Sequence, residues 1–277
     1  SDLTKVAEPV LGYLPLGLSP DTVPIRQPMA TLQQAVEQQD GQLTDEQQIQ
    51  LRGLASEGRE LLAQEIADHD SFEKFKQLRQ VVAELTARFR NIYAATHQLI
   101  RDTEQQPLAQ LDGLVVEIGA GEGQSLVQST DQLPELVVHA FHTKHQHYDP
   151  TMQRIADESN GAVQFDAAKL KGLWRCVEKL AHQPPNGTES CASLLDVVRG
   201  TLRSPSIAGL VAALRALYAL QQQGELRIVR IKNRLRHAAP SGWADCLVNF
   251  VFTADGHQHI CEVQLIHEKM LLVRKDM

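Results

Sequence analysis

Residues 246–267, which read CLVNFVFTADGHQHICEVQLIH, decide the fold class of this protein. Two runs of apolar or alternating residues, at 246–252 and 260–266, have the composition of β-strands. Between them stands Asp255-Gly256, a dipeptide typical of a tight β-hairpin turn. The stretch therefore predicts two antiparallel strands joined at this dipeptide.

A two-residue turn at Asp255-Gly256 would also fix which residues face one another. It places Glu262 opposite Asn249 and Gln264 opposite Leu247. Because side chains alternate along a strand, Glu262, Gln264 and Asn249 then lie on one face of an otherwise apolar hairpin. Such a polar face either points to solvent or forms part of a site.

The segments before the hairpin extend this pattern into a mixed sheet. Residues 206–222 carry apolar side chains at helical spacing, and residues 226–231 alternate as a strand. Short apolar runs at 114–118 and 136–141 also have the composition of strands. We therefore expect an α/β fold, α+β in detail, with a mixed β-sheet and flanking helices across residues 107–277.

The N-terminal part of the chain has a different composition. Five prolines fall within residues 1–30, which predicts an extended Pro-rich arm. Residues 31–106 lack proline and predict a helical region of two to four helices. Within it, residues 44–47 (TDEQ) have the form of a helix-capping box, and apolar residues at 72–92 recur every three or four positions. The mixed-sheet domain at 107–277 follows this helical region.

The composition excludes several classes of partner. Of the 277 residues, 27 are basic and 34 acidic, giving a net charge of −7 that disfavours binding to duplex nucleic acid. No apolar run approaches the roughly 18–20 residues of a membrane span, and the first residues do not resemble a signal peptide, so we expect a cytoplasmic protein without membrane partners. The four cysteines lack CxxC spacing and are expected to be small buried hydrophobic residues.

One motif favours a methyltransferase. Residues 117–123, EIGAGEG, follow an apolar run and resemble the glycine loop with which Rossmann-type methyltransferases bind S-adenosylmethionine. The next apolar run ends at His142, without the acidic residue that would hold the ribose of the cofactor. The alternative is a glycine turn without a binding role, so a methyltransferase is a second hypothesis.

A second group of residues predicts a phosphate-binding surface. On a helix, Lys171, Arg175 and Lys179 would lie four residues apart and share one face. Between residues 199 and 236, eight arginines and lysines stand against a single acid, a local reversal in an acidic chain. Phosphate groups suit such a surface, and a solvated basic face is the alternative.

Two carboxylates are candidate ligands of a divalent cation. Asp196 adjoins the apolar pair Val197-Val198, and Glu262 lies on the predicted hairpin. Hard cations such as Mg²⁺ take a few carboxylate oxygens together with substrate phosphates. We therefore expect Asp196 and Glu262 to hold Mg²⁺ jointly.

The order of these motifs carries a resemblance to a known family. The motifs are the cations at 171, 175 and 179, then DVVRG at 196–200, Lys232 followed by SGW at 241–243, and EVQ at 262–264. Together they resemble the synthetase domain of RelA/SpoT proteins over about residues 165–275. The resemblance implies a nucleotidyltransferase-like mixed sheet and the transfer of pyrophosphate from ATP to GDP or GTP.

The resemblance also implies roles for particular residues. Asp196, Glu262 and Arg199 would be catalytic; Asp196 and Glu262 would bind Mg²⁺, and Glu262 could instead deprotonate the acceptor hydroxyl. Trp243 would take the place of the aromatic residue that stacks on guanine. The substrate-binding residues that it implies, for ATP and a nucleotide acceptor, are Lys169, Lys171, Arg175, Lys179, Arg230, Lys232, Arg234, Ser241, Trp243, Asn249 and Gln264.

The chain departs from the family's pattern at several of these motifs. The usual Asp-x-x-Gly-x-Arg is here Asp-x-x-Arg-Gly, which displaces Arg199 by one position. Trp243 stands where the family has Tyr, and Ala244-Asp245 replaces Arg-Ser. Two further interpretations stay open. One is a transferase with another nucleotide acceptor, and the other is a non-catalytic nucleotide-sensing module that binds a protein partner through its N-terminal helices.

Overall fold

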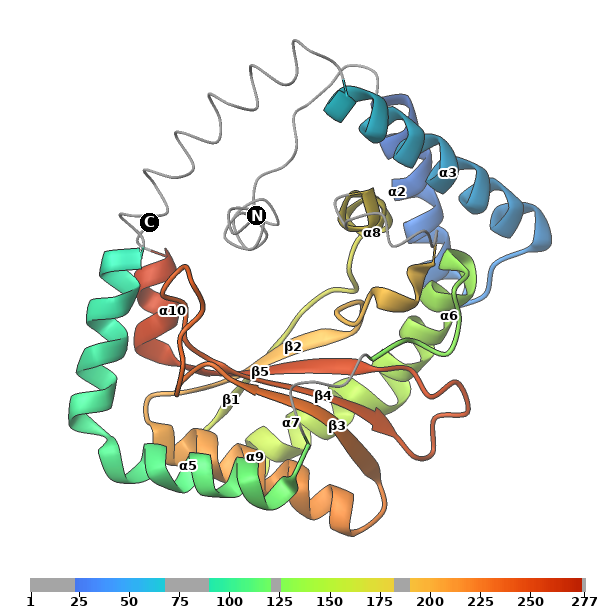
Figure 1. Ribbon diagram of the computed structural model, residues 1–277. Coiled ribbons are helices and arrows are strands. Elements are labelled where there is room, and N and C mark those ends of the chain that lie inside the picture. The colour runs from blue at the N-terminus through green and yellow to red at the C-terminus, as the bar shows by residue number, and fades with distance from the viewer. Residues whose placement is uncertain (1–22, 68–89, 121–125, 182–189, 276–277) are drawn as a thin grey trace.

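A mixed five-stranded β-sheet forms the centre of the protein (Figure 1). The computed structural model describes residues 23–67, 90–120, 126–181 and 190–275. Within these ranges the strand order is β1-β2-β5-β4-β3, with β2 and β5 parallel and the other neighbours antiparallel. The strands are β1 (Gln164–Ala167), β2 (Arg199–Ser204), β3 (Leu226–Asn233), β4 (Cys246–Phe252) and β5 (Cys261–His267). A mixed sheet with flanking helices confirms the expected fold class.

The register predicted for the C-terminal hairpin is confirmed. In the β4–β5 pair, Asn249 faces Glu262 and Leu247 faces Gln264. The strand expected at 226–231 is also present, as β3. The polar residues of the hairpin therefore do share one face of the sheet, as the alternation of side chains requires.

The tight turn predicted between these strands is wrong. β4 ends at Phe252 and β5 begins at Cys261, so a longer loop connects them. Asp255 organises this loop, because its carboxylate accepts hydrogen bonds from the backbone N–H groups of His257 (3.1 Å) and His259 (2.9 Å). An aspartate that bonds its own downstream backbone can shape a wider turn than the dipeptide alone suggests.

Helices cover the lower face of the sheet in Figure 1. There α9 (Ile207–Gln222) packs against α5 (Gln105–Ile118), and α7 (Asp149–Glu158) packs against α9 and β1. The helix predicted at 206–222 is thus confirmed as α9, and its N-cap residue Ser206 accepts a hydrogen bond from the backbone of Gly209 at 3.2 Å. The apolar side of α9 completes the main hydrophobic core beneath the strands.

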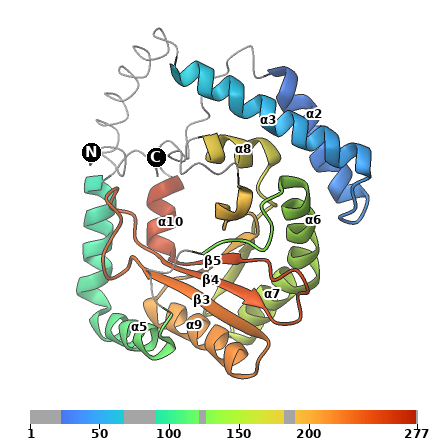
Figure 2. The ribbon, with the colours of Figure 1, turned by 45° about the vertical axis from the view of Figure 1, so that its right-hand side comes forward.

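A second group of helices lies beyond the opposite face (Figures 1 and 2). It consists of α2 (Val23–Gln38), α3 (Asp45–Ala67) and α8 (Leu173–Ala181), and both α2 and α3 contact α8. The predicted capping box begins α3: Thr44 N–H donates to Gln47 Oε1 at 2.9 Å, and Gln47 N–H donates to Thr44 Oγ1 at 3.2 Å. Helical residues 90–103 and α10 (Glu268–Lys275) border the sheet on the other side of this view. Much of the periodic stretch 72–92 lies outside the described residues.

Two of the expected strands are helices. Residues 114–118 belong to α5, and residues 136–141 belong to α6 (Leu133–Thr143). α6 leads into α7 through a π-helical turn, Lys144–Tyr148. Short apolar runs do not distinguish a strand from a buried helical segment, and in both cases packing against other helices decided the outcome.

The prediction of an extended arm over residues 1–30 is wrong for residues 23–30. α2 begins at Val23 and contains Pro28, so residues 23–30 are helical. Pro24 lies in the first helical turn, where the missing N–H has no partner to lose. Residues 1–22 lie outside the described part of the chain.

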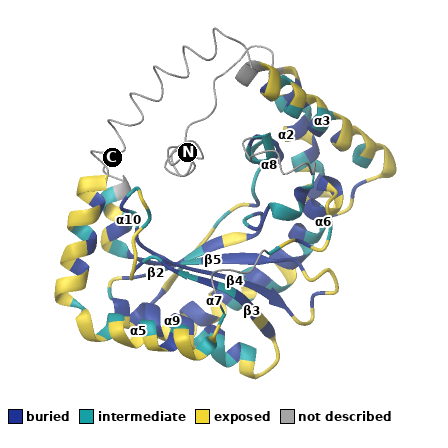
Figure 3. Cartoon of the chain, in the orientation of Figure 1, coloured by how far each residue is buried: buried dark blue, intermediate teal, exposed yellow. Residues whose placement is uncertain are grey.

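Burial follows the layers of the fold, with the strands dark and the outer sides of the helices exposed in Figure 3. All four cysteines are buried and form no disulfide, which confirms their expected role as small hydrophobic residues. Among the described helices, none combines the length and the apolar character needed to cross a bilayer.

Candidate functional site

Four polar side chains form a row across the sheet, on the side away from α9. Arg199 of β2 faces Glu262 of β5, Glu262 faces Asn249 of β4, and Asn249 faces Arg230 of β3. The register of the strands therefore brings together residues that are up to 63 positions apart in the chain. Alternate residues of the same strands, such as Val248 and Val263, belong to the main core.

Asn249 links the row at its centre. Its side chain is fully buried, and its Oδ1 accepts hydrogen bonds from Arg230 Nε (3.0 Å) and Nη2 (2.8 Å). Its Nδ2 donates to the backbone oxygen of Cys261 at 3.3 Å. The amide thus holds the guanidinium of Arg230 in a fixed position beside Glu262.

Glu262 is a buried acid on the central strand β5. It is 8 % exposed, and the described residues give that carboxylate neither a hydrogen bond nor a salt bridge. Burial raises the pKa of the Glu262 carboxyl, and the charge of Asp196 raises it further, against the opposing charge of Lys179. A buried acid of this kind is poised to accept a proton or to bind a cation.

Asp196 lies beside this row and is held by two lysines. The loop before β2 carries it, and its carboxylate contacts Lys171 Nζ at 2.5 Å and Lys179 Nζ at 2.7 Å. Arg199 Nη1 lies 3.8 Å away. Burial alone would raise the pKa of the Asp196 carboxyl, but the charges of and hydrogen bonds from the two lysines outweigh it, and the pKa lies below its ordinary value. Two ammonium groups that converge on one carboxylate can also receive phosphate oxygens.

The predicted stripe of three cations on one helical face does not form. α8 begins at Leu173, so Lys171 precedes the helix and reaches Asp196 from a loop. Arg175 instead pairs with the buried carboxylate of Glu178. Lys169 lines a separate pocket of about 310 Å³ beside α6. Of the four basic residues expected in this block, the structure brings only Lys171 and Lys179 to Asp196.

A second cluster forms around Asp245, directly before the first residue of β4. Trp243 Nε1 donates to Asp245 Oδ2 at 2.9 Å, and Arg234 Nε donates to Asp245 Oδ1 at 2.5 Å. The indole also packs edge-on against Tyr93, with ring centroids 5.4 Å apart. Asp245, which the sequence marks only as a departure from the family's pattern, therefore fixes two residues that were predicted to bind substrate.

The other predicted residues take up varied positions around these clusters. Ser241 Oγ accepts a hydrogen bond from Trp243 N at 3.5 Å. Lys232 and Gln264 both lie opposite Leu247, so they belong to a second row on the face that carries Glu262. In this second row the apolar Leu247 lies between the two polar residues.

Sequence reasoning missed two residues that support Glu262. The fully buried Tyr148 donates its hydroxyl to the backbone oxygen of Glu262 at 2.7 Å. Gly200 makes room for this ring, because a Cβ there would lie 3.0 Å from the hydroxyl oxygen. Gln128 binds the backbone just before β5. Neither Tyr148 nor Gln128 belongs to a motif, so the sequence offered no signal for them.

The structural context expected of a methyltransferase loop is not found. Residues 117 and 118 are the last two of helix α5 and do not follow a strand, and Gly119 ends that helix in the left-handed conformation (φ 69°). A glycine at this position is an ordinary helix C-cap. The remaining glycines of the motif, at 121 and 123, lie outside the described residues.

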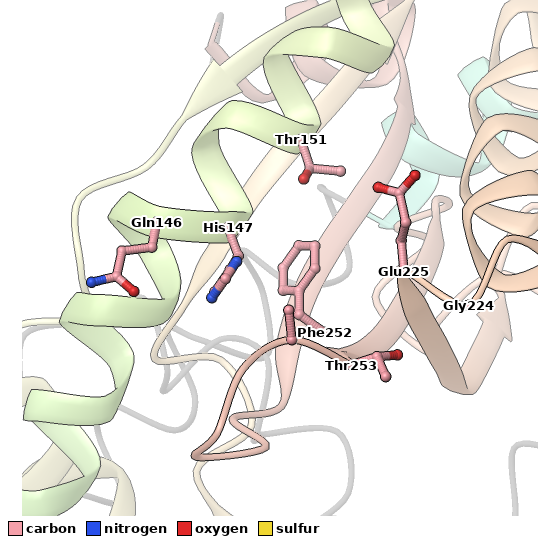
Figure 4. Close-up of a pocket in the computed structure, with 8 residues that line it drawn as sticks. Gln146, His147, Thr151, Gly224, Glu225, Phe252 and Thr253 are labelled. Carbon is pink, nitrogen blue, oxygen red and sulfur yellow. The ribbon is translucent and has the colours of Figure 1, made fainter.

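A pocket of about 410 Å³ lies away from these clusters (Figure 4). It is lined by His147 of the π-helical turn and Thr151 of α7, together with Glu225, Phe252 and Thr253. It contains none of the residues that the sequence predicted to bind substrate. The candidate site is therefore the polar sheet face and the adjoining lysine–aspartate cluster.

Comparisons with known proteins give little further information. A scan against protein families finds no match, and no curated protein matches the chain. A search of solved structures finds similarity to the small alarmone synthetase 2 of Bacillus subtilis, at 19 % identity and a TM-score of 0.36. The match covers 50 % of this chain and 73 % of that protein.

Proposed function

We propose that the protein transfers a pyrophosphoryl group from ATP to a nucleotide acceptor, with Mg²⁺. The observation that carries the proposal is the juxtaposition of Asp196, held by Lys171 and Lys179, with the buried carboxylate of Glu262, to which the described residues give no bonding partner. Phosphoryl-type transfer depends on positioning and charge neutralisation more than on covalent chemistry, and this cluster offers both cations and acids. The resemblance of the sequence motifs to RelA/SpoT synthetase domains supplies the class of reaction.

The lysines would hold the phosphates of ATP. Lys179 has a side chain that is 39 % exposed, so a phosphate can approach it without disrupting the core. Phosphate oxygens would share Lys171 and Lys179 with Asp196, and this would leave oxygens of Asp196 available to a metal ion. Arg199, whose side chain is 46 % exposed, lies next to the same carboxylate and would add a further cation.

The two carboxylates fit a magnesium site by their chemistry. Mg²⁺ is commonly bound by one or two carboxylates together with substrate phosphates, and Glu262 has no competing partner among the described residues. When bound, the ion would neutralise the charge that develops on the transferred phosphates. Asp196 and Glu262 would be its protein ligands.

Glu262 would alternatively receive the proton of the acceptor hydroxyl. The acceptor oxygen forms a bond to the β-phosphorus of ATP, the bond to the bridging oxygen of the α-phosphate breaks, and AMP leaves. A carboxylate with a raised pKa is a stronger base for this proton than an ordinary surface acid. Arg230, fixed by Asn249, and Trp243, fixed by Asp245, would position the acceptor. Lys169 and Arg175 are not part of this proposal.

Incubation with β-labelled ATP, Mg²⁺ and a panel of nucleotides tests the function. We expect label to appear in one or more acceptors and AMP to form in equal amount. Lys179→Ala should weaken ATP binding, whereas Arg154→Ala, which removes an exposed pair with Glu225, should not. ATP binding without transfer would point to a nucleotide-sensing module. The absence of both binding and transfer would overturn the proposal.

A further inference from the structure

Gln128 joins two segments that are far apart in the chain. Its side chain is buried, at 5 % exposure, and its Nε2 donates to the backbone oxygens of Leu194 (2.9 Å) and Ile260 (3.1 Å). Its Oε1 accepts a hydrogen bond from the backbone N–H of Ile260 at 2.9 Å. Its own backbone N–H donates to Ala192 at 2.8 Å. One carboxamide therefore ties the loop before β2 to the start of β5.

The two bound segments are those that carry the two acids. Leu194 lies two residues before Asp196, and Ile260 lies two residues before Glu262. Beyond this point the segments pair directly, since Glu262 N–H donates to the backbone oxygen of Val198 at 2.9 Å. Gln128 thus extends the contact between the two segments just ahead of both carboxylates.

The residue that Gln128 holds belongs to an apolar cluster. Ile260, whose backbone bonds the carboxamide, packs in a small cluster with Leu195, Val229 and Val251, against which Leu126 packs. Hydrogen bonds in such an apolar environment are costly to leave unmade. Only a side-chain amide offers both the donors and the acceptor that these backbone groups need, because a carboxylate donates nothing and a thioether donates nothing and accepts weakly.

We propose that Gln128 is a positioning residue of the transferase, which sets the separation of the Asp196 and Glu262 carboxylates. The inference rests on the function proposed above. Gln128 contacts neither acid among its hydrogen bonds; it acts through the backbone of Leu194 and Ile260. Small errors in the position of reacting groups are expensive in catalysis, on the order of 100-fold for about 1 Å.

The test compares Gln128→Met and Gln128→Glu with Gln132→Met in the full chain. Met keeps the size of the side chain without its hydrogen-bond donors, and Glu keeps only an acceptor for Ile260 N–H. Gln132 is exposed on the same segment and serves as the control. We expect both Gln128 variants to lower kcat by on the order of 10- to 100-fold, with a much smaller change in KM for ATP.

A second measurement does not depend on activity. The affinity for Mn²⁺, measured without nucleotide by electron paramagnetic resonance, should fall in both Gln128 variants and not in Gln132→Met, because the ion needs both carboxylates at a fixed separation. An unchanged Mn²⁺ affinity would overturn the inference even if kcat fell together with stability, since that pattern belongs to a merely structural residue, and so would a wild-type protein that binds no Mn²⁺. If the wild-type protein binds Mn²⁺ but transfers nothing, the proposed function fails. A weaker Mn²⁺ affinity in the Gln128 variants would then still show that Gln128 positions the two acids.

Discussion

Arg199 and Glu262 face each other across the parallel strands β2 and β5. The guanidinium of Arg199 also reaches to within 3.8 Å of Asp196, so one cation stands between two acids. Its positive charge lowers the pKa of the Glu262 carboxyl and so opposes burial, which raises that pKa. The parallel pairing of two short strands thus creates the centre of the candidate site.

Glu262→Gln should abolish most turnover without destabilising the metal-free protein. The amide cannot accept a proton and is a poor ligand for a hard cation, so kcat should fall by about 100-fold or more. Because burial raises the pKa of Glu262, a neutral amide there should leave the melting temperature level or raise it. Steady-state kinetics and thermal unfolding measure the two effects. Glu158→Gln, on an exposed part of α7, is the control, and equal kinetics in both variants would show that Glu262 is an ordinary acid.

Asp196→Asn should reduce stability as well as turnover. It removes the counter-charge of Lys171, whose side chain is only 10 % exposed, and of Lys179. Loss of one partner from a buried ion pair costs about 3 kcal/mol. Urea unfolding at neutral pH should show this loss, whereas Glu225→Gln, in a pair with 45 % exposure on both sides, should change stability by less than about 1 kcal/mol. Because the folded pKa of Asp196 lies below the ordinary 3.8, the contribution of the pair persists at neutral pH and is lost only as the pH falls below about 4.

His259→Phe should reduce the sensitivity of the protein to acid. His259 is fully buried, and neither ring nitrogen has a hydrogen-bond partner among the described residues. Burial lowers the pKa of His259 from 6.5 to about 3; Asp255 opposes this shift, and His139 and His257 add to it. Below about pH 6.5 the unfolded chain takes up a proton that the folded chain refuses, so the free energy of unfolding falls as the pH drops towards 3.

Chemical denaturation between pH 7 and pH 4 measures this slope. The Phe variant should flatten it and should not lose stability at pH 7, because an aromatic ring without polar atoms suits the same space. His237→Phe, at an exposed position, should leave the slope unchanged. An identical slope in the wild type and in His259→Phe would contradict the prediction.

Gly200→Ala should destabilise the sheet beneath Glu262. A Cβ at Gly200 would lie 2.7 Å from the ring of Phe165 and 3.0 Å from the hydroxyl of Tyr148, so both rings must move. Overpacking of this kind costs about 1–3 kcal/mol. Gly113→Ala is the matched control: nothing lies within 4 Å of its Cβ position, and an alanine inside helix α5 should stabilise by about 0.5–1 kcal/mol. Equal effects of the two changes on urea unfolding would show that Gly200 is not packed as described.

The sequence predicted correctly those features that depend on a short, continuous stretch of chain. The capping box at Thr44, the helix α9 and the register that pairs Asn249 with Glu262 were all predictable. Each depends on spacing or alternation along a continuous stretch of chain. The short runs at 114–118 and 136–141 were predicted wrongly, because four to six apolar residues fit either a strand or one side of a helix.

The sequence by itself determined the C-terminal hairpin, the polar face that carries Glu262 and the identity of Asp196 as a candidate partner. Only the tertiary structure decided that Lys171 and Lys179 meet at Asp196 while Arg175 turns to Glu178. It also decided that Gln128 ties the loop before β2 to the start of β5. The physical reason is that strand register follows from the alternation of neighbouring residues, whereas the partner of a long polar side chain depends on which distant segment is packed within its reach.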